Sequence, residues 1–186
     1  MKTKQAPLYK RAFNILISPK AEWFIIQNER NEINALITGF VVPAVSLIAL
    51  IAFTLRMAEA GFVSGIAHFT SIFITNIVSV VIASYILLEL PRNFGGVTTL
   101  GTASAIVVYS SVPSWIATLL IAIHPSLHQL HWLGLYTYLI FYFGLNALIQ
   151  IPEDKRVGFN VIAALILLLV NSLVGVAGKR ILNAII

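Results

Sequence analysis

The sequence predicts an all-α, polytopic membrane protein with five transmembrane helices and an N-terminal interfacial amphipathic helix. Apolar residues make up 59% of the 186 residues and charged residues only 10%, whereas an ordinary soluble domain carries about 25% charged residues. A chain with so little charge lacks the polar side chains that a water-facing surface needs, so most of its surface is expected to face lipid. The apolar residues form long continuous runs, which favours helices over the alternating pattern of a membrane β-barrel.

Each predicted span follows from the length of its apolar run. A helix needs about 20 residues to cross a hydrocarbon layer of ~30 Å. The five predicted spans are residues 35–55, 72–90, 100–123, 133–151 and 157–177. The first run is too long for a signal-peptide core and lacks a small-residue cleavage pattern, so it is interpreted as a permanent span. Residues 1–34 then form a cytoplasmic interfacial arm, and residues 35–186 form the transmembrane domain.

The basic residues predict the orientation of these spans. Six of the twelve Lys and Arg residues lie in the first 30 positions. With a cytoplasmic N-terminus, Arg92, Lys155 and Arg156 join them on the inside, and the remaining three basic residues lie outside. The positive-inside rule therefore predicts a cytoplasmic N-terminus and an external C-terminus. Because no basic stripe recurs elsewhere, the positive net charge does not indicate nucleic-acid binding.

The arm is predicted to contain two short helices. A helix over residues 8–18 collects its polar side chains on one face, namely Lys10, Arg11, Asn14 and Ser18. We expect this amphipathic helix to lie on the inner leaflet with its basic face toward anionic lipid. Ser18 and Pro19 resemble an N-cap followed by proline at the first helical position, which predicts a new helix through Glu22 and Trp23. We interpret the arm as a membrane anchor, with a docking surface for a partner as the alternative.

Polar residues inside the predicted spans form an intramembrane polar patch. Its members are Asn76, Tyr109, Ser110, Ser111, Pro113, Ser114, Asn146 and Asn171. Pro113 lacks an amide hydrogen and frees the carbonyl of Tyr109, which predicts a kink, and nearby hydroxyls commonly satisfy such freed groups. An amide in hydrocarbon needs partners, so the three asparagines are expected to face the bundle interior. We interpret the patch as structural, with a substrate path or ligand site as the alternative.

The remaining chemistry-bearing residues point away from catalysis. His124, His128 and His131 share one helical face and are a weak metal candidate, but no acidic residue lies nearby, and an interfacial loop beginning at Pro125 is the preferred interpretation. Glu89 is expected to pair with Arg92 at the inner end of a span and not to relay protons. The chain has no Cys, and the enzyme motifs G-x-S-x-G, H-E-x-x-H and the Walker loop are absent. We therefore expect neither an enzyme nor a cofactor.

Four segments carry a resemblance to a known family. They are S-P-K-A-E-W-F-I-I-Q-N-E at Ser18 to Glu29, Gly95-Gly96, Y-S-S-V-P at Tyr109 to Pro113, and Leu133 to Arg156, where Pro152 and Lys155 match a P-x-x-K turn. The chain resembles the Yip family, membrane proteins that interact with Ypt/Rab GTPases, and in particular its bacterial branch. The resemblance implies five membrane helices with a cytosolic N-terminus. Pro19, Glu22, Trp23, Pro152 and Lys155 belong to these motifs, and we expect them to face a partner. Rab binding is not implied, because the acidic motif and the long cytosolic domain of eukaryotic members are missing.

The predicted function is therefore that of a non-catalytic membrane scaffold, adaptor or membrane-organising protein, working through the arm and the turn at Pro152. The expected partners are the lipid bilayer and a membrane or cytoplasmic protein. The expected location is the inner (plasma) membrane of a bacterium. The alternative is a small transporter, channel or lipid-moving protein that uses the polar patch around Ser110 and Asn146.

Overall fold

The computed structural model describes residues 7–29, 31–123 and 125–185, and these residues form helices and loops without a strand. Within these residues, four helices are long and apolar enough to cross a membrane: Ile33–Ala60, Phe62–Phe94, Leu100–Ile123 and Glu153–Asn183. The apolar helix Trp132–Leu148 is shorter. The all-helical prediction is confirmed, whereas the predicted fourth span is shorter than expected.

The first part of the chain forms the arm and the first long helix. The arm consists of α1 (Leu8–Ile17) and α2 (Pro19–Gln27). The long helix contains α3 (Ile33–Leu36), a π-helical turn η1 (Ile37–Val41) and α4 (Val42–Ala60). Pro43 has no amide hydrogen to bond the carbonyl of Gly39, and a π-turn is a common way to absorb such a missing bond. The helix ends at Gly61, whose φ of 86° is easily reached only by glycine.

The second and third spans follow. They comprise α5 (Phe62–Glu89) with a 3₁₀ extension η2 (Leu90–Phe94), and then α6 (Leu100–Ser110) and α7 (Val112–Ile123). The break between α6 and α7 falls at Ser111, two residues before Pro113, as the predicted kink requires. Thr99 caps α6 by accepting a hydrogen bond from the backbone N–H of Thr102.

The last part consists of η3 (Pro125–Leu135), α8 (Tyr136–Leu148) and α9 (Glu153–Ile185). The prediction that the fourth span runs to residue 151 is wrong, because the chain becomes extended after Leu148. Pro152 explains this ending, since a proline disfavours helical geometry in the residue before it. Conversely, α9 is longer than its predicted span at both ends, because Glu153 and Asp154 suit the first turn of a helix.

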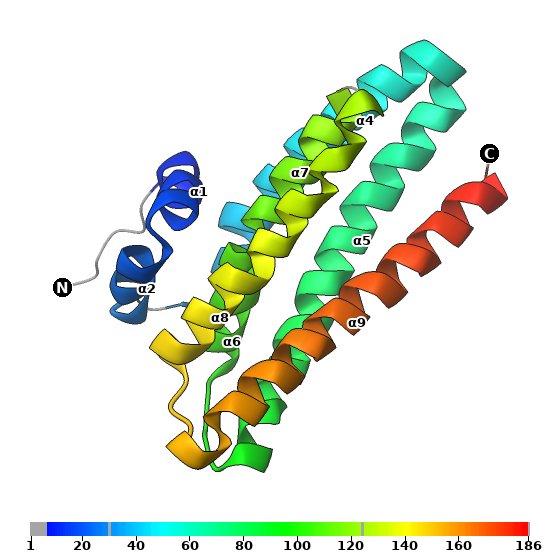
Figure 1. Ribbon diagram of the computed structural model, residues 1–186. Coiled ribbons are helices and arrows are strands. Elements are labelled where there is room, and N and C mark those ends of the chain that lie inside the picture. Colours follow the sequence, from blue (N-terminus) through cyan, green and yellow to red (C-terminus); the bar gives the residue numbers. More distant parts are fainter. Residues whose placement is uncertain (1–6, 30, 124, 186) are drawn as a thin grey trace.

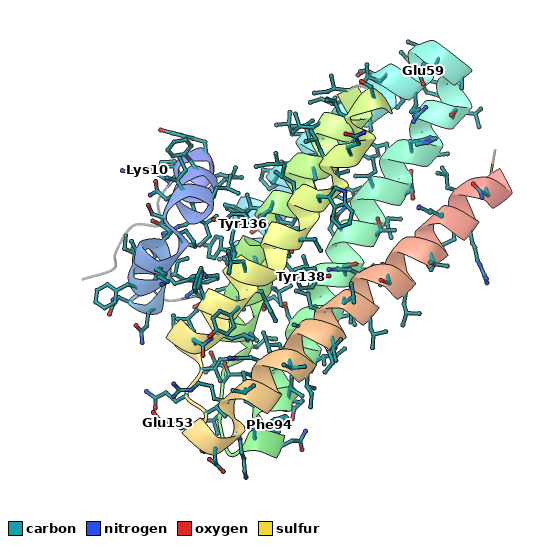
Figure 2. The ribbon with its side chains drawn as sticks, viewed as in Figure 1. Lys10, Glu59, Phe94, Tyr136, Tyr138 and Glu153 are labelled. Carbon is teal, nitrogen blue, oxygen red and sulfur yellow. The ribbon has the colours of Figure 1, made fainter. Side chains whose placement is uncertain are left out.

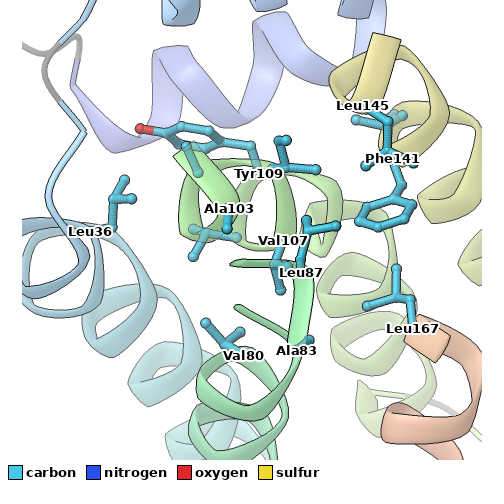
Figure 3. Packing of buried hydrophobic residues seen from close by; sticks show 14 of the residues in the cluster. Leu36, Val80, Ala83, Leu87, Ala103, Val107, Tyr109, Phe141, Leu145 and Leu167 are labelled. Carbon is cyan, nitrogen blue, oxygen red and sulfur yellow. The ribbon is translucent and has the colours of Figure 1, made fainter. Parts of the chain in front are cut away.

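The helices form one bundle with the arm at its side. α4 pairs with α5, α5 also contacts α9, and α6 and α7 lie between α4 and α8, while α1 and α2 pack beside α6 and α8 (Figure 1). Buried apolar side chains from these helices form one core, in which Val107 lies close to Leu87 and Phe141 (Figure 3). Only 22% of the most apolar window of α9 is buried, so most of this helix presents apolar side chains outward, as a lipid-facing helix does.

Candidate functional site

The arm is fixed to the bundle by a buried ion-pair network. Arg11 of α1 is only 1% exposed, and its guanidinium contacts the carboxylates of Glu22 and Glu29. The same guanidinium lies over the ring of Tyr109 in α6, 5.7 Å from the ring centre. The prediction that Arg11 faces anionic lipid is therefore wrong. Because α2 folds back beside α1, two carboxylates lie within reach of Arg11 and pair with it in place of lipid headgroups.

Trp23 of α2 forms the second attachment of the arm. Its indole N–H donates to the backbone carbonyl of Ile140 at 3.0 Å, and its ring meets the edge of Tyr109. A Cβ at Gly144 would lie 2.7 Å from the Trp23 ring, so only glycine lets the indole approach α8 this closely. The Tyr136 hydroxyl adds a hydrogen bond to the carbonyl of Leu16 at 2.8 Å.

These contacts change the interpretation of the predicted partner-facing residues. Glu22 and Trp23 are buried against the bundle, so the prediction that they face a partner is wrong for both. Pro19 begins α2 and is partly exposed, while Pro152 and Lys155 are exposed. The outward face of the arm consists of other residues and includes five large apolar side chains: Tyr9, Phe13, Ile17, Phe24 and Ile25.

The segments that carry the family resemblance meet in space, although they lie far apart in the sequence. Trp23 from the first segment contacts Tyr109 from the third and Ile140 from the fourth. At the end of the bundle that holds Glu153, a Cβ at Gly96 would lie 2.6 Å from the carbonyl oxygen of Gln150. The glycine pair and the Pro152 turn therefore pack against each other, and the turn holds the start of α9 near the end of α5.

The predicted polar patch is divided among three places. Tyr109, Ser110 and Pro113 are buried, with Tyr109 directed toward the arm (Figure 3). Asn146 is exposed on α8, where its side-chain oxygen accepts a 3.3 Å hydrogen bond from the amide of Asn160. Asn171 is also exposed. The expectation that all three asparagines face the bundle interior is therefore wrong for Asn146 and Asn171.

The third place is a groove, here called the polar groove, between α5, α7, α8 and α9. It has a volume of about 610 Å³, within the range of small-molecule sites. Its polar lining residues are Thr75, Asn76, Ser79, Ser111, Ser114, Trp115, Tyr138, Asn171 and Ser172. None of the described residues that line it is charged. The groove lies near the middle of the long helices, at the depth where a hydrocarbon core would surround the bundle.

Along one wall of the polar groove, the polar side chains form hydrogen bonds within the protein. The indole N–H of Trp115 donates to the side-chain oxygen of Asn76 at 2.9 Å, and the Asn76 amide donates to the carbonyl of Ile72. The hydroxyls of Ser114 and Thr137 lie 2.7 Å apart in a hydrogen bond. These bonds hold α5, α7 and α8 together on the floor of the groove.

The arm and the polar groove lie on opposite sides of α8. Tyr136 and Tyr138 are two residues apart, so they project about 200° apart around the helix. Tyr136 points toward the arm and binds Leu16, whereas Tyr138 points toward α5 and α9 and lines the groove (Figure 2). α8 therefore separates two sites that differ in chemistry, one held by buried charge and one built from neutral polar groups.

Several of these residues were missed by reasoning from the sequence. Tyr138, Ser79 and Ser172 were not assigned to the patch, although each is a polar residue within a predicted span. The available signal for the role of Arg11 was the pair of acidic residues Glu22, in α2, and Glu29, just after it. Glu89 and Arg92 form the predicted ion pair, with 2.5 Å between side-chain nitrogen and oxygen. His124 and the side chains of His128 and His131 lie outside the described residues.

Comparison with known proteins gives one result. A model of the Yip1 domain family matches residues 13–175. Neither the curated proteins nor the solved structures gave a match. The matched range includes α2, the Pro152 turn and every residue that lines the polar groove. Because this one family model covers most of the sequence, the chain belongs to the Yip1 family.

Proposed function

We propose that the chain is a non-catalytic membrane scaffold that organises the surrounding lipid through its docked arm. The observation that carries the proposal is the firm attachment of the arm. Arg11 and Trp23 hold α1 and α2 against the bundle, so the outward face of the arm keeps a fixed position relative to the long helices. A scaffold needs such a rigid surface, whereas a loosely tethered anchor does not.

The chemistry of the outward face favours lipid as its partner. Tyr9, Phe13 and Ile17 recur every fourth residue on α1 and are each more than half exposed, which gives a continuous apolar stripe. The side chain of Lys10 is exposed on the same helix, whereas the ammonium of Lys20 lies over the ring of Phe143 in α8, 5.1 Å from its centre. Apolar side chains beside basic residues are typical of helices inserted at the boundary between headgroups and acyl chains.

The position of the arm suggests how lipid would be organised. Its contacts along α6 run from Gly101, which Asn31 approaches, to Tyr109, which meets Trp23. This part of α6 is about 12 Å long. α1 also contacts α7, so the arm covers somewhat more than this within the ~36 Å of the span Leu100–Ile123. The arm therefore widens the molecule along one part of its height only. A protein that is wider in one leaflet than in the other favours curved membrane.

A curvature-sorting measurement tests this proposal. Fluorescently labelled full-length protein is reconstituted into vesicles of mixed diameter made from neutral and anionic phospholipid. We expect its density to differ between small and large vesicles, and the difference to disappear in Arg11→Met, which releases the arm. Arg56→Met, which breaks an exposed ion pair, is the control. Equal density of the native protein at all diameters would reject the membrane-organising role.

A photo-crosslinker on the arm separates lipid from protein partners. Because the chain has no Cys, a benzophenone attached to Phe13→Cys marks a single position in native membranes. We expect mainly lipid adducts. If the crosslinker instead captures one protein in stoichiometric amount, and this capture is lost in Arg11→Met, the arm serves as an adaptor and not as a lipid organiser.

We further propose five spans with a cytoplasmic N-terminus in a bacterial inner membrane. Support for the fifth span comes from the geometry of Trp132–Leu148. Its 13 α-helical residues rise by about 20 Å, and the preceding four 3₁₀ residues add about 8 Å because a 3₁₀-helix rises ~2.0 Å per residue. The sum approaches the ~30 Å of a hydrocarbon core. The basic residues support the orientation.

The polar groove favours a second candidate function, that of a small transporter or lipid-moving protein. Neutral polar side chains from several helices at mid-membrane depth are what an uncharged or amphiphilic substrate would need. The lack of charged residues among the described lining residues argues against ion-coupled pumping. Scrambling of a fluorescent lipid between leaflets of proteoliposomes is the test. Transfer no faster than in protein-free vesicles would reject this function.

A further inference from the structure

The free hydrogen-bonding groups of the polar groove lie together on one side. Thr75, Asn76, Ser111 and Ser114 use their side chains within the protein. Ser79, Tyr138, Asn171 and Ser172 have no hydrogen bond to another described residue. These four residues come from α5, α8 and α9, and all of them line the same groove.

Free polar groups at this depth need an occupant. Hydrocarbon offers neither hydrogen-bond donors nor acceptors. If acyl chains alone filled the groove, its hydroxyls and amide would be left without hydrogen bonds, which is energetically costly. Each of the four side chains both donates and accepts hydrogen bonds. A ligand with hydroxyl or ester oxygens satisfies such a set, whereas a pure hydrocarbon does not.

The described residues that line the groove are all uncharged, which favours a ligand with an uncharged polar group. A phosphate-bearing headgroup is normally bound through Arg or Lys side chains, and the described lining has neither. Val80, Leu135 and Leu168 supply apolar wall beside the polar groups. The groove thus combines neutral hydrogen-bonding groups with an apolar surface suited to an acyl chain.

We propose that the polar groove binds a neutral glycerolipid, with the uncharged glycerol and ester region held by Ser79, Tyr138, Asn171 and Ser172 and an acyl chain along the apolar wall. This inference deepens the second candidate function by naming the class of ligand. It requires binding only, and it stands whether or not the lipid is moved between leaflets.

Photolabelling of the full-length protein in phosphatidylcholine nanodiscs tests the proposal. The probe is a diacylglycerol with a photoactivatable diazirine in its acyl chain, and the labelled peptides are identified by mass spectrometry. We expect labels to concentrate on peptides that contain residues 134–138 and 168–175. Labels spread evenly over the outward-facing helices would overturn the proposal.

Two double variants on matched residue types show whether labelling depends on the groove. Tyr138→Phe with Asn171→Leu removes a hydroxyl and an amide from the groove. Tyr142→Phe with Asn146→Leu makes the same chemical changes at two exposed positions of α8 outside it. We expect the first pair to lower groove labelling about tenfold, the effect of two lost hydrogen bonds, and the second pair to leave it unchanged. Equal labelling of the two double variants would overturn the proposal.

Two further results would replace the proposed ligand. A photoactivatable phosphatidylglycerol that labels the groove as strongly as diacylglycerol would show that a neutral headgroup is not selected. A disulfide-linked dimer formed efficiently by Ser172→Cys would show that a second copy of the chain fills the groove. Failure of lipid scrambling together with specific labelling would reject lipid transfer and leave the binding site standing.

Discussion

Replacing Arg11 with methionine is the most direct test of how the arm is held. Methionine keeps much of the aliphatic volume but removes the charge shared by Glu22 and Glu29. The side chains of these two residues are only 4% and 5% exposed, so they would remain buried without a cationic partner. Removing one member of a buried ion pair costs about 3–5 kcal/mol, and we expect the loss to appear as release of the arm.

Hydrogen exchange of the backbone amides measures this release. If the free energy of releasing the arm falls by about 3–5 kcal/mol, the amides of α1 and α2 should exchange roughly 150- to 5,000-fold faster in detergent micelles. Arg56→Met is the matched control, because the Arg56–Glu59 pair has side chains 46% and 57% exposed. Such a pair contributes only about 0–1 kcal/mol, so the arm should remain protected in this variant.

A rescue variant separates the lost charge from a general loss of packing. Adding Glu22→Gln and Glu29→Gln to Arg11→Met removes the unpaired charges, and replacing a whole buried ion network by neutral residues is often nearly neutral in stability. We expect the triple variant to recover most of the protection of the arm. If Arg11→Met exchanges as slowly as Arg56→Met, or if the triple variant is no more protected than Arg11→Met, the network does not hold the arm.

Two further predictions follow from the packing and from the orientation. Gly144→Ala should lower the free energy of unfolding by about 1–3 kcal/mol in a detergent unfolding titration, because the added Cβ would overlap the Trp23 ring. Gly39→Ala is the control and should cost clearly less, because no atom lies within 4 Å of its added Cβ. Equal losses in the two variants would contradict the close packing of Trp23 on Gly144. Reporter fusions at Met1 and Ile186 should place these ends on opposite sides of the membrane. Cytoplasmic reporters active at both ends would exclude an odd number of spans.

Hydropathy and local backbone rules accounted for the elements that lie within one stretch of chain. The third predicted span matches the helix Leu100–Ile123 at both ends. The helix that begins at Pro19, the break before Pro113 and the Glu89–Arg92 pair also follow the predictions. Each of these features depends on residues within a few positions of one another, so it can be predicted from the sequence directly.

The orientation of polar side chains was decided by tertiary structure. Arg11 was assigned to the lipid surface on the basis of its own helix, but the return of α2 brought two carboxylates beside it. Asn146 and Asn171 were expected to face inward, yet both are exposed: Asn146 lies on an outer face of α8, and Asn171 lines the open polar groove. A helical period specifies which residues share a face, but not which face meets the core.

Composition and hydropathy are enough to identify this chain as a helical membrane protein, because the free energy of placing a segment in lipid depends mainly on the composition of that segment. The docking of the arm and the set of polar residues that line the groove depend instead on the tertiary structure. The Trp23–Ile140 hydrogen bond joins residues 117 positions apart, and the groove draws its lining from four helices. Such contacts depend on how the helices pack together, and that packing is a property of the whole bundle.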